Sequence, residues 1–440
     1  MPLKPTSRSI AIEPMTDDKA SKRPPLMSLD EALSLVLKDV SVLTQTDWVK
    51  TFEADGRVLS HDLVSGLQVP PQDNSSMDGY AVRVEDVTHV GASLKVTQRI
   101  PAGQHGHALN SGEAARIFTG APIPPGANAV VMQEDTQVAS TENAQADVPV
   151  IVVNSAPALG QWIRRSGDDV TLGSVVMQKG TRLDPAGLGL AASIGLAQIE
   201  VMRKPRVALF STGDELVMPG DVAPENMRPG AIYNSNRFFL RALLVRLGCE
   251  VTDLGIVPDN FQATLAVLRD AASDHDLVLT SGGVSVGEED HVKPAVEALG
   301  GLNLWQISMK PGKPFAFGFL KSQASEHAAY FMGLPGNPVS SFVTFQLLVR
   351  PFLLAIQGVR KVQAEPLQLK ANFDLPKPDK RREFLRVKRN AQGGLDLFPN
   401  QSSGVLTSVV WGDGVVDNPG SNVIQSGDLV RFYPFSEWLQ

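Results

Sequence analysis

The sequence predicts a multidomain α/β protein built around a doubly wound, mostly parallel sheet. The chain has 440 residues, which exceeds the roughly 250–300 residues at which single hydrophobic cores divide. Between residues 201 and 359, short apolar runs typical of buried strands alternate with helical segments, a pattern that indicates parallel strands covered by helices. Elsewhere, short alternating runs punctuated by Gly and Pro predict β-rich regions.

The N-terminal region is expected to contain a tail and a helix. Residues 1–26 are polar and rich in Pro, which predicts a disordered tail and not a signal peptide. Residues 27–64 are predicted to be helical. Ser28 can cap this helix, with Glu31 three residues later completing a capping box, and apolar residues recur at helical spacing through Val36 and Leu37.

A β-rich insert is predicted over residues 65–169. It opens on the turn-rich run PPQDNSSMDGYAV and contains the strand-like runs SLKVTQRI, ARIFTG, AVVMQE and VPVIVV. Residues 170–200 then return to a Gly- and Ala-rich turn and helix. We expect them to pack on the first helix, so that 27–64 and 170–200 form a discontinuous linker domain.

The region 201–359 is the predicted sheet domain. Its expected strands are RVALF, DLGIV, DLVLT, LWQISM and YFMG, separated by helices such as FFLRALLVRL and FQATLAVLRDAA. Residues 360–440 return to short strand-like runs, including REFLRVKRN and GDLVRFYPF. They predict a small C-terminal β-barrel or sandwich.

Composition excludes several classes of function. The net charge of −7 argues against nucleic-acid binding, which needs a dominant cationic surface. The single cysteine, Cys249, excludes an intrachain disulfide or a multi-cysteine metal site and fits a reducing, cytoplasmic setting. The apolar stretch 342–356 is interrupted by Gln346, Arg350 and Pro351, so we predict a core helix and no membrane span.

Chemistry is expected at the loops that follow the predicted strands, because open α/β sheets bind ligands beyond the carboxyl ends of their strands. Five such loops are polar. They carry Thr212, Gly213 and Glu215; Asp259; Ser281, Gly282, Gly283, Ser285 and Asp290; Lys310 and Lys313; and Pro335 and Pro338. Each loop alone is explained as a tight turn, but all five together indicate a ligand site.

These loops have the composition of an anion site. Glycines allow close approach of the backbone, whose N–H groups can cradle a phosphate, and Lys310 and Lys313 add compact positive charge. Carboxylates beside a phosphate would repel it unless a hard cation lies between them. Glu215, Asp259 and Asp290 therefore imply Mg²⁺.

The insert carries a second polar group, which includes Asp78 in SSMDGY, Thr119 after a strand, and Arg164 and Asp169 in IRRSGDD. Alternative explanations remain open here. Asp78 would also suit an Asx-turn or cap, and Arg164 and the neighbouring Arg165 would suit surface ion pairs with the acidic residues that follow.

Familiar catalytic signatures are absent. His105 and His107 form an HxH pair in a loop that we expect to be exposed and without metal. The sequence contains no HExxH, GxSxG, CxxC, Walker A or GxGxxG motif, so it predicts neither P-loop nor nicotinamide chemistry.

The motifs as an ordered set resemble one family. PPQDNSSMDGYAV, RIFTGAPIPPGANAVV, IRRSGDDV, STGDEL, YNSN, TSGGVSVGEEDHVK, MKPGKPFAFG and LPGNPVSS occur in this order. Together they resemble the MoeA/gephyrin E-domain family, the molybdopterin molybdenumtransferases, from about residue 27 to the C-terminus. The sheet domain alone also resembles molybdopterin adenylyltransferases, and a non-catalytic scaffold like gephyrin is a further alternative.

The resemblance implies an elongated homodimer of four-domain subunits. Its active site would lie between the sheet domain of one subunit and the insert of the other. There the family accepts adenylylated molybdopterin, binds molybdate, hydrolyses the adenylate with a divalent cation and places molybdenum on the dithiolene. A molybdopterin adenylyltransferase and cofactor-accepting proteins are the implied protein partners, with no role for nucleic acid or a membrane.

The resemblance also assigns roles to individual residues. The implied catalytic residues are Asp78, Thr119, Glu215, Asp259, Asp290 and Lys310, with the three carboxylates of the sheet domain on Mg²⁺. The implied substrate-binding residues are Arg164, Asp169, Thr212, Gly213, Ser281, Gly282, Gly283, Ser285, Lys313, Pro335, Pro338, Arg381 and Ser403. Arg381 and Ser403 resemble positions that handle molybdate. Gln306 departs from the family, in which a lysine is usual.

Overall fold

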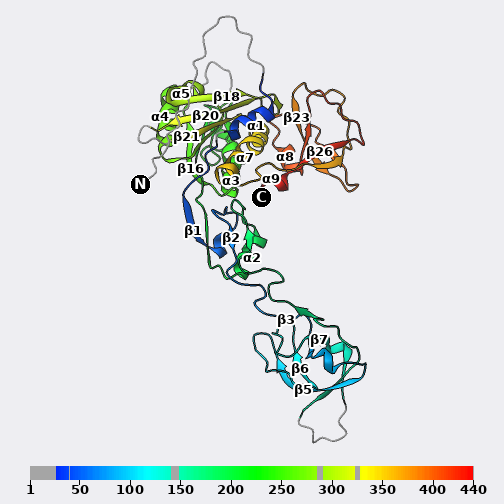
Figure 1. Cartoon of the computed structure of the whole chain (residues 1–440). Helices are drawn as coiled ribbons and strands as arrows, with labels where there is room; N and C mark the ends of the chain where they lie inside the picture. Colours follow the sequence, from blue (N-terminus) through cyan, green and yellow to red (C-terminus); the bar gives the residue numbers. More distant parts are fainter. Residues whose placement is uncertain (1–25, 39, 140–147, 285–290, 323–327, 440) are drawn as a thin grey trace, which may run out of the picture.

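The chain is elongated, with the two predicted polar groups at opposite ends. The computed structural model describes residues 26–38, 40–139, 148–284, 291–322 and 328–439. Nearly all of the predicted tail, together with Ser285 and Asp290, lies outside these residues. Figure 1 shows the central sheet and a C-terminal sheet at one end, a narrow middle region, and the β-rich insert at the other end.

The central sheet has six strands in the order β16-β13-β17-β21-β20-β18. The first four are parallel to one another, as predicted, and β20 runs antiparallel to both of its neighbours. The sequence prediction missed β20. The strands are β13 (Arg206–Thr212), β16 (Glu250–Val257), β17 (Leu277–Ser281), β18 (Gly300–Gln306), β20 (Pro314–Lys321) and β21 (Ala328–Leu334).

Helices cover both faces of this sheet, which confirms the doubly wound prediction. Along β13, Val207 and Leu209 pack with α3 and α7, whereas Ala208 and Phe210 pack with α4 and α5. This alternation follows from the two-residue period of a strand. The helices are α3 (Asn236–Arg246), α4 (Phe261–Asp274), α5 (Val292–Leu299), α6 (Pro338–Thr344) and α7 (Arg350–Ile356), with a π-helical turn at Phe345–Val349 between the last two.

The apolar helix of this domain is a core helix, as predicted. It runs without a break over Pro338–Ile356, and by length and composition alone it could cross a membrane. The interruption by Gln346, Arg350 and Pro351 therefore does not exclude a span. The burial of this helix identifies it as a core helix, because 83% of its most apolar window lies inside the protein.

The first helix is shorter than predicted and packs elsewhere. α1 spans Leu29–Lys38, and its capping box is present: Ser28 N donates to Glu31 Oε2 at 2.9 Å and Glu31 N donates to Ser28 Oγ at 3.2 Å. The prediction of helix through residue 64 was wrong. So was its packing on 170–200, because the apolar stripe of α1 is buried against the central sheet domain.

The narrow middle region is made by β-pairing of two distant segments. β1 pairs with β12, and β2 pairs with β11, both antiparallel. α2 begins at an Asp184 cap that accepts from Gly187 N, and Leu59, Leu183 and Val201 are buried together beside it. The elements are β1 (Thr46–Lys50), β2 (Leu63–Val64), β11 (Val175–Met177), α2 (Pro185–Ser193) and β12 (Gln198–Met202), with a 3₁₀ turn at Thr51–Glu53.

The insert is a six-stranded sheet in the order β7-β4-β6-β5-β9-β8, next to a short β3–β10 pair. This agrees with the β-rich prediction, and both His105 and His107 are exposed. The strands are β3 (Asn74–Ser75), β4 (Gly79–Val82), β5 (Ala92–Ile100), β6 (Glu113–Ile117), β7 (Ala129–Met132), β8 (Thr136–Val138), β9 (Val150–Val153) and β10 (Ile163–Arg164), with 3₁₀ turns at Val84–Asp86 and Gln133–Asp135.

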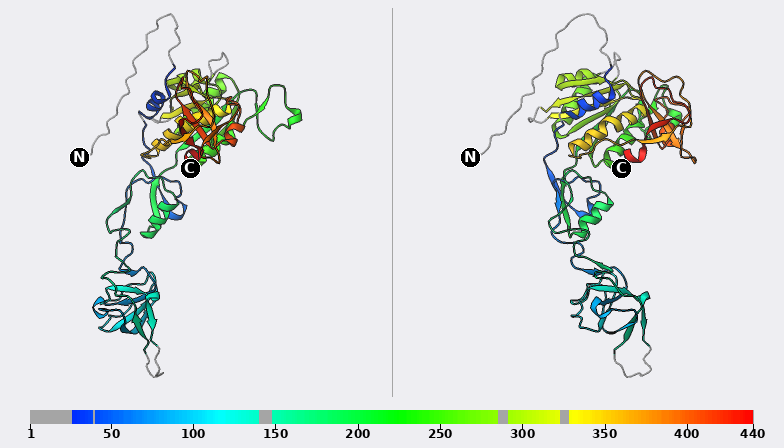
Figure 2. Two further views of the ribbon diagram at one scale, coloured as in Figure 1. Left: turned by 90° about the vertical axis from the view of Figure 1, so that its right-hand side faces the viewer. Right: turned by 45° about the vertical axis from the view of Figure 1, so that its right-hand side comes forward.

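Between β13 and α3 the chain leaves the body of the sheet domain as a projecting arm, seen in the left view of Figure 2. It contains β14 (Leu216–Val217), a 3₁₀ turn (Pro224–Asn226) and β15 (Ile232–Tyr233), and the two strands pair in parallel.

The C-terminal sheet is joined directly to the central sheet domain. β19 leaves the central domain and pairs in parallel with β23, which sets Lys310 opposite Glu383. The closed barrel stays a prediction, since the strand path of the described residues runs from β19 to β22 without closing. The elements are β19 (Met309–Lys310), β22 (Leu367–Lys370), β23 (Arg382–Arg389), β24 (Leu395–Leu397), α8 (Thr407–Trp411), β25 (Gly414–Asn418), β26 (Leu429–Pro434) and α9 (Phe435–Leu439).

Candidate functional site

The loops after β13, β17 and β21 meet at one rim of the central sheet, because the three strands are parallel neighbours. Gly282 N donates to Leu334 O at 3.1 Å. Asn236, at the start of α3, donates from Nδ2 to Ser281 Oγ at 2.8 Å and to Gly336 O at 2.7 Å. The quoted YNSN motif ends in this residue, but no role was assigned to Asn236 from the sequence.

The glycines of this rim are required by the backbone. Gly282 and Gly283 have φ values of +97° and +64°, and a Cβ atom on either would lie within 2.6 Å of Thr212 atoms. Positive φ and close approach both favour glycine. The loop after β17 therefore lies against the loop after β13, with backbone exposed where side chains would otherwise stand.

Three buried hydroxyl groups at these strand ends have no hydrogen-bond partner among the described residues: Ser211 Oγ, Thr212 Oγ1 and Thr280 Oγ1. Buried polar atoms are normally paired, so such groups need an explanation. For Thr212 Oγ1, which lies beside Gly282 and Gly283, a ligand with oxygen acceptors bound at this rim would supply one. Gly213 follows directly and accepts from Leu216 N at 3.0 Å.

Carboxylates lie on the adjacent loops after β13 and β16. Asp259 N donates to Asp214 Oδ1 at 3.4 Å, and Glu215 follows Asp214. The described residues contain no group of three His, Cys, Asp or Glu side chains that could hold a metal ion. Mg²⁺ commonly uses one or two carboxylates and completes its shell with water and substrate phosphates, so this donor set fits it. Asp290, the third predicted ligand, lies outside the described part.

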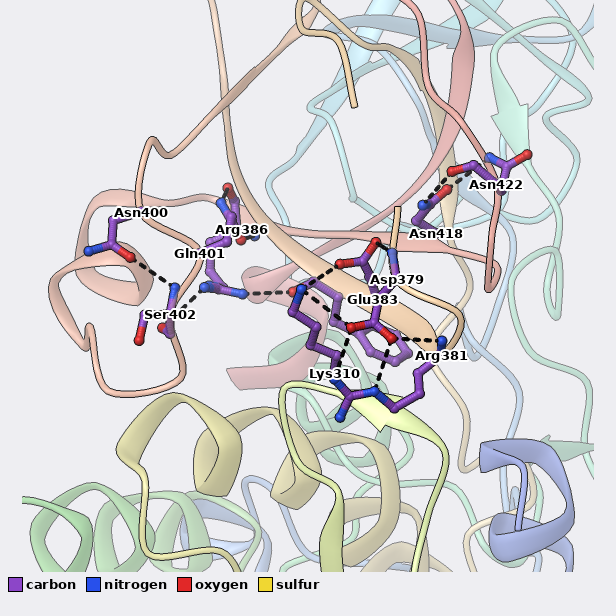
Figure 3. Close-up of polar contacts among 11 residues, drawn as sticks. Lys310, Asp379, Arg381, Glu383, Arg386, Asn400, Gln401, Ser402, Asn418 and Asn422 are labelled. Carbon is purple, nitrogen blue, oxygen red and sulfur yellow. Dashed lines mark hydrogen bonds and ion pairs between the residues drawn. The ribbon is translucent and has the colours of Figure 1, made fainter. Parts of the chain in front are cut away.

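A second, charged cluster forms where the central domain meets the C-terminal sheet (Figure 3). Lys310 Nζ lies 3.1 Å from Glu383 Oε1 and 3.6 Å from Asp379 Oδ2. Arg381 binds Asp379 with two nitrogens, Nε to Oδ1 at 3.0 Å and Nη2 to Oδ2 at 2.9 Å. These hydrogen bonds and the charge of Lys310 hold the pKa of Asp379 far below its ordinary value. We call Lys310, Asp379, Arg381 and Glu383 the charged cluster.

The loop that carries Ser403 adjoins both groups. Ser403 O accepts from Val339 N, in the first turn of α6, at 2.9 Å, and Pro338 begins that helix. Gly312, between Lys310 and Lys313, also lies against α6, near Ser340 and Thr344. The structure thus places predicted site residues from both domains close together, namely Lys310, Pro338, Arg381 and Ser403.

Arg386 anchors this loop and was missed by the sequence analysis. Its side chain is buried, and it donates to Ser408 Oγ, Phe384 O and Ser402 O. Burial lowers the pKa of Arg386 to about 10. Gln401 reinforces the contact by accepting from Arg386 N and donating to Arg386 O.

The remaining predicted residues of the rim lie nearby. Pro335 O accepts a long 3.4 Å bond from Ser281 Oγ, and Lys313 O accepts from Ile307 N at 2.9 Å. Gln306, where a lysine is usual in the family, pairs with Pro314 at the base of the Lys310 loop.

The polar group of the insert is organised around Asp78. Its Oδ1 accepts from Thr119 N at 2.7 Å and from Thr119 Oγ1 at 2.8 Å, which lowers the pKa of Asp78. An ion pair of Arg165 with the acidic residues that follow was one of the alternatives left open, and the side chain of Arg165 has a different partner. Arg165 Nη1 instead binds Asp73 Oδ2 at 2.6 Å, because the β3–β10 pairing brings these segments together. Arg164 is exposed opposite Asn74, and Asp169 N donates to Val69 O.

Within one chain, the insert group is remote from the rim and the charged cluster. Figure 1 shows the insert strands β3–β7 beyond the narrow middle region, away from the central sheet. One chain therefore does not bring Asp78 and Thr119 to Lys310 or Glu215.

Comparison with known proteins accounts for almost the whole described chain. Residues 27–195 match the MoeA N-terminal region (domain I and II), residues 208–355 a probable molybdopterin binding domain, and residues 368–435 the MoeA C-terminal region (domain IV).

Curated relatives and a solved structure agree with these matches. The chain is 40% identical over 422 residues to a molybdopterin molybdenumtransferase of Haemophilus influenzae, with 94% of this chain and all of the relative covered. It is 34% identical over 419 residues to that of a Nostoc species, with 92% of each chain covered. The crystal structure of a molybdopterin biosynthesis moeA protein from Pyrococcus horikoshii matches with a TM-score of 0.78 and 29% identity, covering 93% of this chain and all of that one.

The matched regions and the glycine-lined rim place the chain in a class of proteins, the enzymes of molybdenum cofactor biosynthesis that have a molybdopterin-binding α/β domain. Within that class, the chain belongs to the MoeA family of molybdopterin molybdenumtransferases. The resemblance drawn from the motifs is thereby confirmed.

Proposed function

We propose that the chain places molybdenum from molybdate on adenylylated molybdopterin, with Mg²⁺-dependent release of AMP. The observation that carries this proposal is the charged cluster. Lys310 from the central domain and Arg381 from the C-terminal domain meet there, and the Ser403 loop packs on α6 beside the glycine-lined rim. Phosphate and molybdate are both oxyanions, and two adjacent sites for oxyanions are what this reaction needs.

At the rim, the backbone of Gly282 and Gly283 and the hydroxyls of Thr212 and Ser281 would bind the phosphate side of the pterin substrate. Gly213 allows the β13 loop to approach, and Pro335 and Pro338 would fix the loop that borders it. Fixed donors of this kind position charge without reorganising during the reaction. Ser285, outside the described residues, belongs to the same proposed loop.

Glu215, Asp259 and Asp290 would hold Mg²⁺, which when bound would polarise the phosphoanhydride of the adenylate. The protein itself would orient the anhydride and exclude alternative geometries. Lys310, Lys313, Arg381 and Ser403 would bind the oxygens of molybdate. Gln306 cannot supply the positive charge of the lysine common in the family, so the remaining cations carry more of this task.

We also propose that the working site is shared in a homodimer. Asp78, Thr119, Arg164 and Asp169 of one subunit would complete the rim of the other, since they lie far from their own (Figure 1). The proposed setting is the cytoplasm. A molybdopterin adenylyltransferase would supply the adenylate, and the finished molybdenum cofactor would be delivered to cofactor-accepting apoproteins.

The test is an insertion assay with the purified chain. Supplied with adenylylated molybdopterin, molybdate and Mg²⁺, it is expected to release AMP and to activate a molybdenum-free apoenzyme. Glu215→Ala is expected to slow AMP release by roughly a hundredfold, the scale of removing one electrostatic contact from a transition state.

The alternatives give different results in the same assay. An adenylyltransferase would form the adenylate from molybdopterin and ATP, and a scaffold would do neither reaction. Release of AMP at the normal rate by Glu215→Ala would exclude the role proposed for that carboxylate.

A further inference from the structure

The charged cluster holds two cations and two carboxylates, so it has no excess positive charge for an incoming anion. Lys310 and Arg381 are the side chains proposed to bind molybdate. Both are already engaged: Arg381 by both oxygens of Asp379, and Lys310 by Glu383 and by Asp379.

The two carboxylates are not equivalent. The Glu383 side chain is only 5% exposed and accepts both from Lys310 Nζ and from Asp379 N, at 2.9 Å for the latter. It therefore belongs to the framework. The Asp379 side chain is 25% exposed. Its oxygens face the guanidinium of Arg381 and the ammonium of Lys310 (Figure 3), which is the arrangement that a bound oxyanion would adopt.

The backbone of Asp379 is held independently of its side chain. Asp379 N donates to Glu383 Oε2, and Asp379 O accepts from Ser421 N at 2.7 Å. Rotation of the Asp379 side chain would free the guanidinium of Arg381 and break the 3.0 Å hydrogen bond that Arg381 N donates to Asp379 Oδ1. The two backbone hydrogen bonds would still hold Asp379 in place.

We propose that Asp379 is an internal competitor for the molybdate subsite, which lowers the affinity of that subsite for its anion. This inference rests on the proposed function. In the free protein the Asp379 carboxylate occupies the oxyanion position between Arg381 and Lys310. Molybdate, a dianion that can accept from both cations at once, displaces it.

The test measures binding of molybdate alone to the full-length chain by titration calorimetry, without pterin. Asp379→Asn keeps the size and an acceptor oxygen but removes the charge. It is expected to lower the Kd for molybdate roughly tenfold, because molybdate no longer has to displace a carboxylate from the two cations. The same variant is expected to bind sulfate, which is also a tetrahedral dianion, more tightly by a similar factor.

Asp413→Asn is the matched control. Asp413 is also an acidic partner of an arginine in the C-terminal sheet, 3.7 Å from Arg389 Nε, at the far end of the β23–β25 ladder from Glu383. Its removal changes net charge equally and is expected to leave the Kd unchanged. Asp379→Ser serves as a second variant, with circular dichroism showing that each protein is folded.

The inference is overturned if the folded Asp379 variants bind molybdate no more tightly than the wild type, or if Asp413→Asn has the same effect. Molybdate binding by Lys310→Ala and Arg381→Ala shows whether only the competition by Asp379 is wrong or whether the proposed function is wrong as well. If both weaken molybdate binding while Asp379→Asn changes nothing, the subsite stands and only the competition is wrong. If neither has any effect, the proposed molybdate subsite is wrong as well.

Discussion

Asp276 shows how a single buried carboxylate can tie the middle region to the central sheet. It precedes β17 and accepts 2.7 Å hydrogen bonds from Arg203 Nη1, Arg203 Nη2 and Arg206 N. Burial raises the pKa of Asp276, but the hydrogen bonds from Arg203 and Arg206 N outweigh it, so the pKa lies below its ordinary value. The ionised form is therefore the one that the fold stabilises.

Replacement of Asp276 by Asn is expected to cost about 3 kcal/mol of unfolding free energy, because it leaves the Arg203 charge without its partner. Urea unfolding near neutral pH measures this. The pKa of Asp276 is lower in the folded state than in the unfolded state. Its contribution to the free energy of unfolding is therefore complete above the pKa of the unfolded state, about 3.9, and is lost as the pH falls through the pKa of the folded state. Wild type and variant should accordingly converge only in acid.

Asp274→Asn provides the comparison, as Asp274 is exposed at the end of α4 and should change stability by no more than about 0.5 kcal/mol. Equal effects of the two substitutions, or a difference that vanishes already at mildly acidic pH, would contradict the role of the buried pair.

At the residue level, the sequence singles out candidate site residues where a short local run has a characteristic composition. Thr212, Gly282 and Lys310 belong to short runs whose composition already indicates an anion site. Asn236 and Arg386 were assigned no role, because what defines them is contact with distant segments: Asn236 binds groups 45 and 100 residues away. Arg386 lies in none of the quoted motifs, and the YNSN run that ends in Asn236 does not by itself indicate a role for that residue. The roles of the predicted site residues stay predictions until variants are measured.

At the scale of secondary-structure elements, the turn after β17 is the feature on which the rim depends. Gly282 and Gly220 have the same φ of +97°, but a Cβ on Gly282 would lie 2.5 Å from Thr212 O, whereas a Cβ on Gly220 would meet nothing within 4 Å. Substitutions at these two glycines therefore separate the free-energy cost of backbone strain from the cost of close packing.

Gly220→Ala is expected to cost roughly 1 kcal/mol from the left-handed backbone alone. Gly282→Ala should cost roughly 2 kcal/mol more, because the β13 and β17 loops must move apart. Thermal or urea unfolding of both variants measures the difference. Losses that are equal within error would show that the two loops do not pack as tightly as described.

Element-level prediction was accurate for periodic segments and failed where the period was short or mixed. The strands β13, β16, β17 and β21 follow from apolar runs between helices. β20 was missed because PFAFGFLK, which follows the Lys310 loop directly, was not separated from it. The helix was extended past Lys38 although the sequence there has strand character, as β1 shows. The domain limits stay predictions.

At the scale of the whole molecule, the distance between Asp78 and the rim decides how the protein can work. If the insert residues act at the site, they must act on another subunit, because the narrow middle region holds them away from their own sheet domain (Figure 1). An antiparallel arrangement of two such chains about a two-fold axis would present two equivalent sites, as expected for a symmetric dimer.

This predicts complementation between inactive subunits. Asp78→Ala and Lys310→Ala proteins, each inactive in the insertion assay, are mixed and allowed to exchange subunits. Half of the dimers would then be mixed, and each mixed dimer would contain one intact site and one doubly altered site, so recovery should approach about a quarter of wild-type activity.

A mixture of Asp78→Ala with Thr119→Ala should stay inactive, since both changes fall in the insert and no intact site can form. Absence of recovery in the first mixture, with subunit exchange demonstrated by differently tagged chains, would mean that each chain completes its own site and that the elongated form described here is not the one that acts.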